Sequence, residues 1–169
     1  MIYLDNNGTT FLLDEVKDRI AELLAGSLGN PAANSASGEI AAGILTTARE
    51  NVAALIGADP SNIIFTSSGS EANVSVVRSV LKTSGRPAVV TSEIEHASLR
   101  ELWPVLRAEG FEVRIARTLR TGQVDIEHML ELIDDSVALV SLQAVNNETG
   151  VIQPYEIAGE AAHGVGARL

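Results

Sequence analysis

Short apolar runs alternate with longer amphipathic stretches along most of the chain. The runs at 63–66, 87–91, 112–115 and 138–142 are short and apolar enough to be strands. The stretches at 70–82, 97–109, 125–133 and 155–163 are predicted helices, and the last of them should lead into another strand that the residues up to 169 do not reach. This alternation predicts an α/β fold with a mostly parallel sheet and helices packed on its faces.

The beginning of the chain has a different pattern. After a short extended arm, apolar residues at helical spacing predict a helix at 13–24, and the Gly- and Asn-containing stretch at 26–38 predicts a long loop. An alanine-rich helix is expected at 39–56, ended by Gly57. We therefore divide the chain into an N-terminal segment of arm, helices and loop (1–61) and an α/β segment (62–169).

The junction after the run at 63–66 is rich in small polar residues and reads SSGSE at 67–71. The free N–H groups of a first helical turn, together with the helix dipole, attract anions. Gly69 permits close approach to the backbone, and the Ser70 hydroxyl adds a donor. An ordinary N-cap formed by Ser68 or Ser70 explains the same residues, and on these residues alone it is the simpler interpretation.

Polar residues also follow two other predicted strands. They are Glu93, Glu95 and His96 after the run at 87–91, and Asn146 and Asn147 after the run at 138–142. In an open parallel sheet ligands bind beyond the carboxyl ends of the strands, so we expect Ser70, His96 and Asn147 to converge there. A half-exposed histidine and plain turn chemistry explain the residues one by one. The two glutamates are interpreted as solvated carboxylates, or as carboxylates that complement a helix dipole, and are given no catalytic role.

Composition narrows the classes of function. The chain has 169 residues, 46% of them hydrophobic, and a formal net charge of −10. That charge argues against nucleic acid or an anionic membrane surface as partner, and no apolar run approaches the roughly 20 residues that a bilayer needs. The chain has no cysteine for a thiolate site, and its 3 histidines are too well separated to support a metal centre. No signal peptide is expected, and the cytoplasm is the expected compartment.

Several stretches together resemble one enzyme family. They read YLDNNGTT at 3–10, GNP at 29–31, FTSSGSEAN at 65–73, EH at 95–96 and VNNETG at 145–150. In this order they are similar to the N-terminal part of the cysteine desulfurases, which belong to the class V aminotransferase family of pyridoxal-phosphate enzymes. The resemblance covers essentially the whole chain. It implies an incomplete three-layer α/β/α domain of fold type I, preceded by an N-terminal arm and helix segment.

The resemblance also implies roles for the nominated residues. Gly69 and Ser70 match the pair that holds the cofactor phosphate. His96 matches a histidine that stacks on the pyridine ring and takes part in proton transfer, and Asn147 matches an asparagine that contacts the cofactor near the substrate carboxylate. The family converts L-cysteine to L-alanine and passes the sulfur on as a persulfide, for example to iron–sulfur cluster assembly. A sulfur-acceptor protein and a homodimer are partners that the resemblance implies.

The chain departs from the family pattern in several places. Gly8 stands where alanine is usual, Ser35 where histidine is usual, and Ser70 where threonine is commoner. The family's Schiff-base lysine and persulfide cysteine have no counterpart here, and neither lysine of the chain is a candidate for the former. In the family's sheet order the run at 63–66 lacks a neighbour from this chain. We therefore expect the chain alone to be unstable or to associate strongly.

Three hypotheses follow for the function. The first is a cysteine desulfurase-like enzyme that needs a complementary C-terminal portion for activity. The second is an inactive remnant that binds a phosphate-bearing ligand or serves as an interaction module. The third is a selenocysteine lyase or another class V pyridoxal-phosphate enzyme, which the residues present do not separate from the first.

Overall fold

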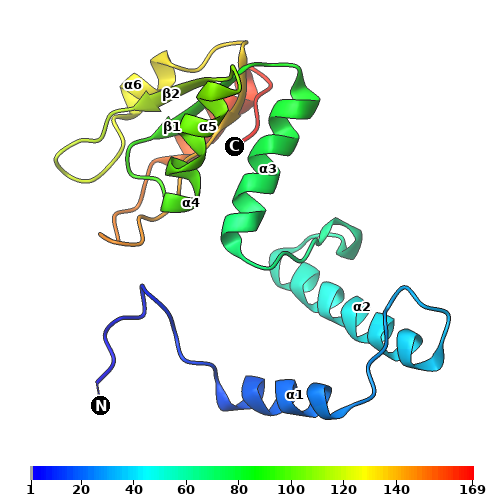
Figure 1. The fold of residues 1–169 in the computed structure, drawn as a ribbon. Helices are drawn as coiled ribbons and strands as arrows, with labels where there is room; N and C mark the ends of the chain where they lie inside the picture. The colour runs from blue at the N-terminus through cyan, green and yellow to red at the C-terminus, as the bar shows by residue number, and fades with distance from the viewer. Residues whose placement is uncertain (1) are drawn as a thin grey trace. The chain divides into compact units, whose positions relative to one another are not determined.

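The structure is a computed structural model that describes residues 2–169. The chain divides into two compact units, one extending to Phe65 and one formed by Thr66–Leu169 (Figure 1). All the nominated site residues belong to the second unit. No helix among residues 2–169 is long and apolar enough to cross a membrane.

The first unit contains the helices α1 (Asp14–Ala25) and α2 (Ala36–Ile56) and the 3-10 helix η1 (Pro60–Asn62). The two predicted helices are confirmed. α2 begins earlier than expected because the Ser35 hydroxyl accepts a hydrogen bond from the Gly38 N–H at 3.2 Å and so caps the helix. It ends as predicted at Gly57, whose φ of 67° lies in the left-handed region that favours glycine.

The segment 63–66, a predicted strand, forms no strand. The backbone is extended at Ile63 (φ −88°, ψ 121°), yet no described segment of the chain pairs with it. Ile64 is 83% exposed. The prediction is wrong because a β-strand requires a ladder partner, and residues 2–169 supply none here. This outcome agrees with the sheet order that the family resemblance implied.

The second unit is built on a parallel sheet of three strands, and these three strands are the remaining predicted ones. They are β1 (Ala88–Ser92), β2 (Glu112–Ala116) and β3 (Val137–Val140), in the order β2-β1-β3. Every residue of the central strand β1 is buried. Arg168 forms an isolated parallel bridge with Leu139 on the far side of β3, where a further strand was expected.

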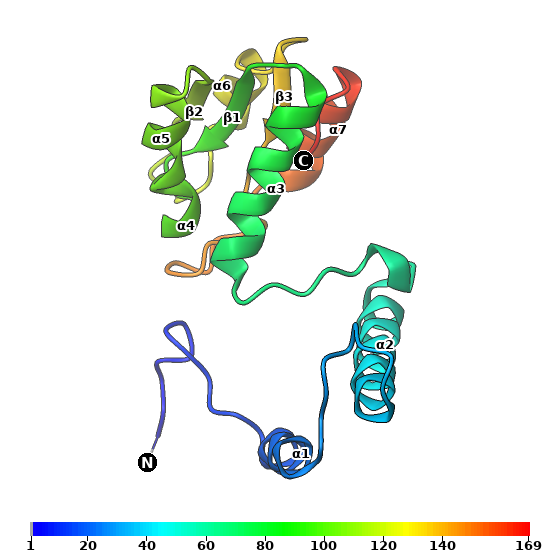
Figure 2. The same ribbon diagram turned by 45° about the vertical axis from the view of Figure 1, so that its right-hand side comes forward.

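Helices cover both faces of this sheet, as predicted. α3 (Gly69–Ser84), α4 (Ala97–Arg100) and α5 (Leu102–Ala108) pack on one face, where Val77, Leu106 and Val89 share one apolar cluster. α6 (Ile126–Glu131) and α7 (Tyr155–Gly164) pack on the other, where Met129, Ala158 and Val90 share a second cluster. Figure 2 shows α3 to α5 in front of the sheet and α6 and α7 behind it.

The predicted helix at 97–109 is divided into α4 and α5. Pro104 explains the division, because proline has no N–H to donate to the carbonyl of Arg100 four residues earlier, and its ring crowds that carbonyl. α4 accordingly ends at Arg100, and α5 begins at Leu102. The two short helices still bury Leu99, Leu102 and Trp103 against the sheet.

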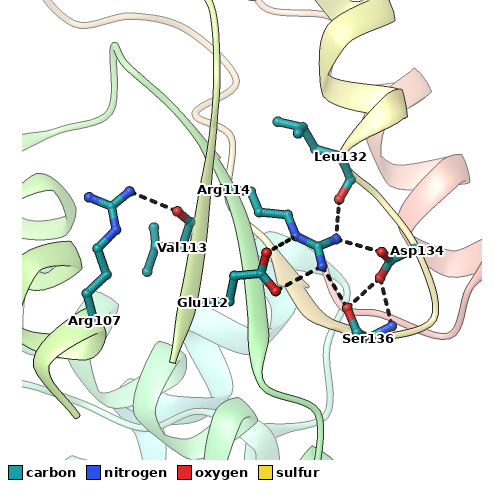
Figure 3. A network of polar contacts seen from close by, with 7 residues as sticks. All are labelled: Arg107, Glu112, Val113, Arg114, Leu132, Asp134 and Ser136. Atoms are coloured by element: carbon teal, nitrogen blue, oxygen red, sulfur yellow. Dashed lines mark hydrogen bonds and ion pairs between the residues drawn. The ribbon is translucent and has the colours of Figure 1, made fainter. Parts of the chain in front are cut away.

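The Arg114 side chain links β2 to the loop before β3 at the amino end of the sheet. Arg114 of β2 contacts Glu112 at 2.9 Å, Asp134 at 2.9 Å and the Leu132 carbonyl at 2.8 Å, and it also donates to Ser136 (Figure 3). It therefore connects one outer strand with the loop that enters the other, β3. Its side chain is only 17% exposed.

Candidate functional site

Two adjoining hollows open at the carboxyl ends of β1 and β3. The first, of about 360 Å³, is lined by the start of α3 and by the strand ends, including Asn73, Glu95, His96 and Gln143. The second, of about 330 Å³, is lined by the loops that follow the two strands, including Glu95, His96, Asn146 and Asn147. Glu95 and His96 form the wall between them. The structure thus brings His96 and Asn147 to one hollow, whereas Gly69 and Ser70 line neither.

The start of α3 combines an N-cap with free donors. The Ser68 hydroxyl accepts the Glu71 N–H at 3.1 Å, so Ser68 is the capping residue. The Glu71 carboxylate accepts from the hydroxyl and the N–H of Ser67, at 2.6 and 2.7 Å, and these bonds hold the pKa of Glu71 below its usual value. Within residues 2–169 the N–H groups of Gly69 and Ser70 have no acceptor. The cap therefore leaves two aligned donors open.

These donors suit a phosphate group. A Cβ built on Gly69 would meet no atom within 4 Å, so the space beside its Cα is open. The Ser70 hydroxyl adds a third donor, and the positive end of the helix dipole favours negative charge at this place. Asn73 on the next turn lines the first hollow together with His96. The donors at Gly69 and Ser70 have the chemistry that binds a phosphate group, and the first hollow extends from His96 to the first turns of α3.

The His96 ring is oriented by α4. His96 is the N-cap of this helix, and its Nδ1 accepts the Ser98 N–H at 3.1 Å. The Ser98 hydroxyl lies 2.9 Å from the same nitrogen and accepts a hydrogen bond from the Asn73 amide at 2.9 Å. Because Nδ1 is an acceptor, the neutral ring carries its proton on Nε2. The chain Asn73–Ser98–His96 thus ties the ring to α3.

Asn146, which the sequence analysis left without a role, shapes the loop after β3. Its side-chain oxygen accepts the N–H groups of Glu148 and Thr149 at 3.0 and 2.9 Å, and its side chain is almost fully buried. The exposed neighbour Asn147 donates to the Glu148 carboxylate at 3.1 Å and lines the second hollow. The two adjacent asparagines therefore differ in role, because Asn146 stabilises the turn and Asn147 lines the second hollow.

Glu95 was also misjudged from sequence. It is 4% exposed, so the interpretation as a solvated carboxylate is wrong for it, while Glu93 is exposed as expected. Burial raises the pKa of Glu95, and hydrogen bonds from Gln143 and Ser92 offset part of this effect. The sequence carries no local signal for this burial, because Gln143 lies 48 residues further along the chain.

Comparisons with known proteins give one family. The sequence model described as Aminotransferase class-V matches residues 2–169. A cysteine desulfurase of Cereibacter sphaeroides is 41% identical over 98% of this chain and 44% of that protein, and a selenocysteine lyase of Bos taurus is 36% identical over 90% and 40%. A solved NifS-like protein superposes with a TM-score of 0.90 at 32% identity, over 95% of this chain and 45% of that one. The chain thus spans less than half the length of each.

Proposed function

Because the chain belongs to the class V aminotransferase family, we propose that it forms the cofactor-binding part of a pyridoxal-phosphate enzyme of the cysteine desulfurase type. The proposed reaction converts L-cysteine to L-alanine and transfers the sulfur as a persulfide. The observation that carries the proposal is the hollow shared by His96 and Asn147, next to a second hollow that runs from His96 to the first turns of α3.

In this proposal the start of α3 binds the phosphate group of the cofactor. The amides of Gly69 and Ser70 and the Ser70 hydroxyl donate to phosphate oxygens, and the helix terminus contributes favourable charge. This function needs no lysine or arginine, which agrees with the strongly acidic chain. Threonine, the commoner residue of the family at this position, has the same hydroxyl as Ser70.

His96 and Asn147 act where the ring and the substrate lie. Bound pyridoxal phosphate supplies an electron-withdrawing ring that stabilises negative charge on the substrate. His96 presents Nε2 for holding or moving a proton, because Nδ1 is occupied by Ser98. Asn147 donates through its side-chain amide to an oxygen of the substrate or cofactor. The thiol that takes the sulfur comes from a complementary portion, since this chain has no cysteine, and so does the lysine that holds the cofactor, since neither Lys17 nor Lys82 matches the family's Schiff-base lysine.

The test combines the chain with a complementary C-terminal portion that carries such a lysine and cysteine. With pyridoxal phosphate, L-cysteine and a thiol reductant, the mixture is expected to form alanine and sulfide in equal amounts, and either portion alone is expected to form none. Ser70→Ala should weaken pyridoxal phosphate binding about tenfold, as for one hydrogen bond to a charged group. Ser75→Ala, an exposed position of the same helix, is the matched control. Failure to form alanine with every such portion contradicts the proposal.

Two alternatives lead to different outcomes of the same experiment. The likeness to a selenocysteine lyase favours a selenium substrate as the second candidate, and a higher kcat/KM for L-selenocysteine than for L-cysteine would support it. An inactive phosphate-binding module would instead bind pyridoxal phosphate in a Ser70-dependent manner without forming alanine. A homodimer, a sulfur-acceptor protein and a cytoplasmic location accompany the first proposal.

A further inference from the structure

The loops that carry His96 and Asn147 are fastened to each other. Glu95 Oε1 accepts the Ser92 hydroxyl at 3.0 Å and the Gln143 N–H at 2.9 Å. The carbonyl of Ile94 accepts the side-chain amides of Gln143 and Asn146, the latter at 3.2 Å. We call Ile94, Glu95, Gln143 and Asn146 the clasp. It joins the segment that follows β1 to the segment that follows β3.

The clasp is continuous with both nominated side chains. Glu95 immediately precedes His96, and Asn146 immediately precedes Asn147. Asn146 links the clasp to the turn that follows it. Its amide nitrogen donates to the Ile94 carbonyl of the clasp, and its oxygen accepts two backbone N–H groups of the turn. A shift of the clasp therefore moves the backbone on which His96 and Asn147 stand.

Burying the Glu95 carboxylate at the centre of the clasp costs desolvation free energy. Glu95 forms no ion pair within residues 2–169, and burial raises its pKa. A glutamine would accept the same two hydrogen bonds with a smaller desolvation cost. What the carboxylate adds is strength, because hydrogen bonds to an ionised acceptor are shorter and stronger than neutral ones. Such a cross-link is useful where the geometry of two loops must be held closely.

We propose that Glu95 is a positioning residue, which fixes His96 relative to Asn147 by joining the ends of β1 and β3 through the clasp. The inference rests on the proposed function in one respect, namely that the cofactor ring contacts His96. The phosphate donors of α3 are not part of the clasp. Loss of Glu95 should therefore weaken binding of the ring and leave binding of phosphate unchanged.

The test uses the full chain and two ligands. Pyridoxamine 5′-phosphate carries ring and phosphate but no aldehyde, so it avoids chance reaction with lysines, and inorganic phosphate reports the α3 donors alone. Glu95→Ala should lower the affinity for pyridoxamine 5′-phosphate about tenfold, as for loss of a charge-assisted hydrogen bond, and should leave the affinity for inorganic phosphate unchanged. Glu95→Gln and Gln143→Ala keep part of the clasp, so each should lower the affinity for pyridoxamine 5′-phosphate only about threefold. Glu131→Gln, an exposed carboxylate on α6, is the control.

Two further measurements separate positioning from general damage. Hydrogen exchange of the Gln143 N–H should accelerate in Glu95→Ala and recover in Glu95→Gln, and the NMR signals of the His96 ring should shift in the first variant and return towards the wild-type positions in the second. Equal weakening of both ligands, or an unchanged Gln143 exchange rate and His96 signal in Glu95→Ala, overturns the proposal. If Glu95→Ala does not fold, wild-type behaviour of both Glu95→Gln and Gln143→Ala overturns it. If the wild-type chain binds neither ligand, the proposed function fails, while exchange and His96 signals still decide the clasp.

Discussion

The two ends of the parallel sheet differ in the surroundings of the carboxylates of Glu112, Asp134 and Glu95. At the amino end, Glu112 and Asp134 are exposed and paired with Arg114. The pKa of Glu112 is lowered mainly by its bond to Arg114, and that of Asp134 mainly by its bonds to Ser136. At the carboxyl end, Glu95 is buried without a cation, and burial raises its pKa. At the amino end the carboxylates form ion pairs, whereas at the carboxyl end burial disfavours the charged form of Glu95.

From this difference we expect the amino end to serve stability and the carboxyl end to serve the proposed binding. Arg114, Glu112, Asp134 and Ser136 satisfy one another at the amino end, so a ligand would gain little from these groups. The carboxyl end has two hollows, and at the start of α3 the amides of Gly69 and Ser70 have no acceptor within residues 2–169. Groups left unsatisfied in the free protein are available to a ligand, and this is the edge where ligands bind in open parallel sheets. Substitutions at the two ends should therefore affect different measurements.

The largest effect is expected at the amino end, from Arg114→Met. The variant keeps an apolar stem, but it leaves Glu112 and Asp134 as unbalanced like charges and the Leu132 carbonyl without its donor. We expect the free energy of unfolding to fall by about 2 kcal/mol, since the mostly buried Arg114 side chain loses its hydrogen bonds to two carboxylates and the Leu132 carbonyl loses its donor. Urea unfolding followed by circular dichroism measures the change.

Arg78→Met is the matched control for this prediction. Arg78 pairs with Glu109 at 2.9 Å, but both side chains are well exposed, at 44% and 39%. Exposed ion pairs contribute little because water and salt screen them, so the change should be much smaller than for Arg114. Equal losses in the two variants would mean that the amino-end network has no special role in stability.

A smaller effect, on binding alone, is expected from Gly69→Pro. Gly69 is the first residue of α3, where proline is tolerated, and the extended backbone of Ser68 suits a following proline. The substitution removes one free N–H without disturbing a helical hydrogen bond. The affinity for inorganic phosphate should fall about tenfold, as for one hydrogen bond to a charged ligand, with the urea midpoint nearly unchanged.

Ala36→Pro tests whether this effect belongs to the site. Ala36 is the first residue of α2 and also follows an extended N-cap serine, so the substitution removes the equivalent N–H from another helix. Isothermal titration calorimetry should give wild-type phosphate affinity for this variant. A loss similar to that of Gly69→Pro would show that phosphate binds helix ends in general, and the contrast between the two ends of the sheet would then lose its functional meaning.

Sequence patterns predicted the elements whose causes are local. Apolar runs and helical spacing gave the three paired strands and all the long helices, and the motifs from 3–10 to 145–150 gave the family, which the comparisons confirm. The features that were wrong or missed depend on distant residues. The segment 63–66 lacks a ladder partner in the described chain, and the buried Glu95 accepts a hydrogen bond from Gln143, which no local pattern links to it. The division at Pro104 has a local cause, because proline lacks the N–H that a continuous helix needs there.

The smallest effect is the response of stability to pH, which should have one sign for the amino-end carboxylates and the opposite sign for Glu95. Glu112 and Asp134 have lowered pKa values in the folded chain, so their stabilisation is complete above the ordinary values of 4.5 and 3.8 and is lost as pH falls through the lowered ones. Glu95 has a raised pKa, so the folded chain binds its proton more tightly than the unfolded chain does. Its contribution makes stability fall as pH rises from 4.5 through the raised value.

Urea midpoints measured between about pH 3 and 8, a range that brackets these carboxyl groups, should therefore rise and then decline. Glu95→Gln has no proton to lose and should abolish the decline while keeping the rise, because it leaves the amino end intact. Asp134→Asn should reduce the rise and keep the decline. A decline that survives in Glu95→Gln would mean that another group causes it. The buried carboxylate would then be tolerated without a measurable penalty, and the argument that its retention reflects a role in holding the site would lose its energetic basis.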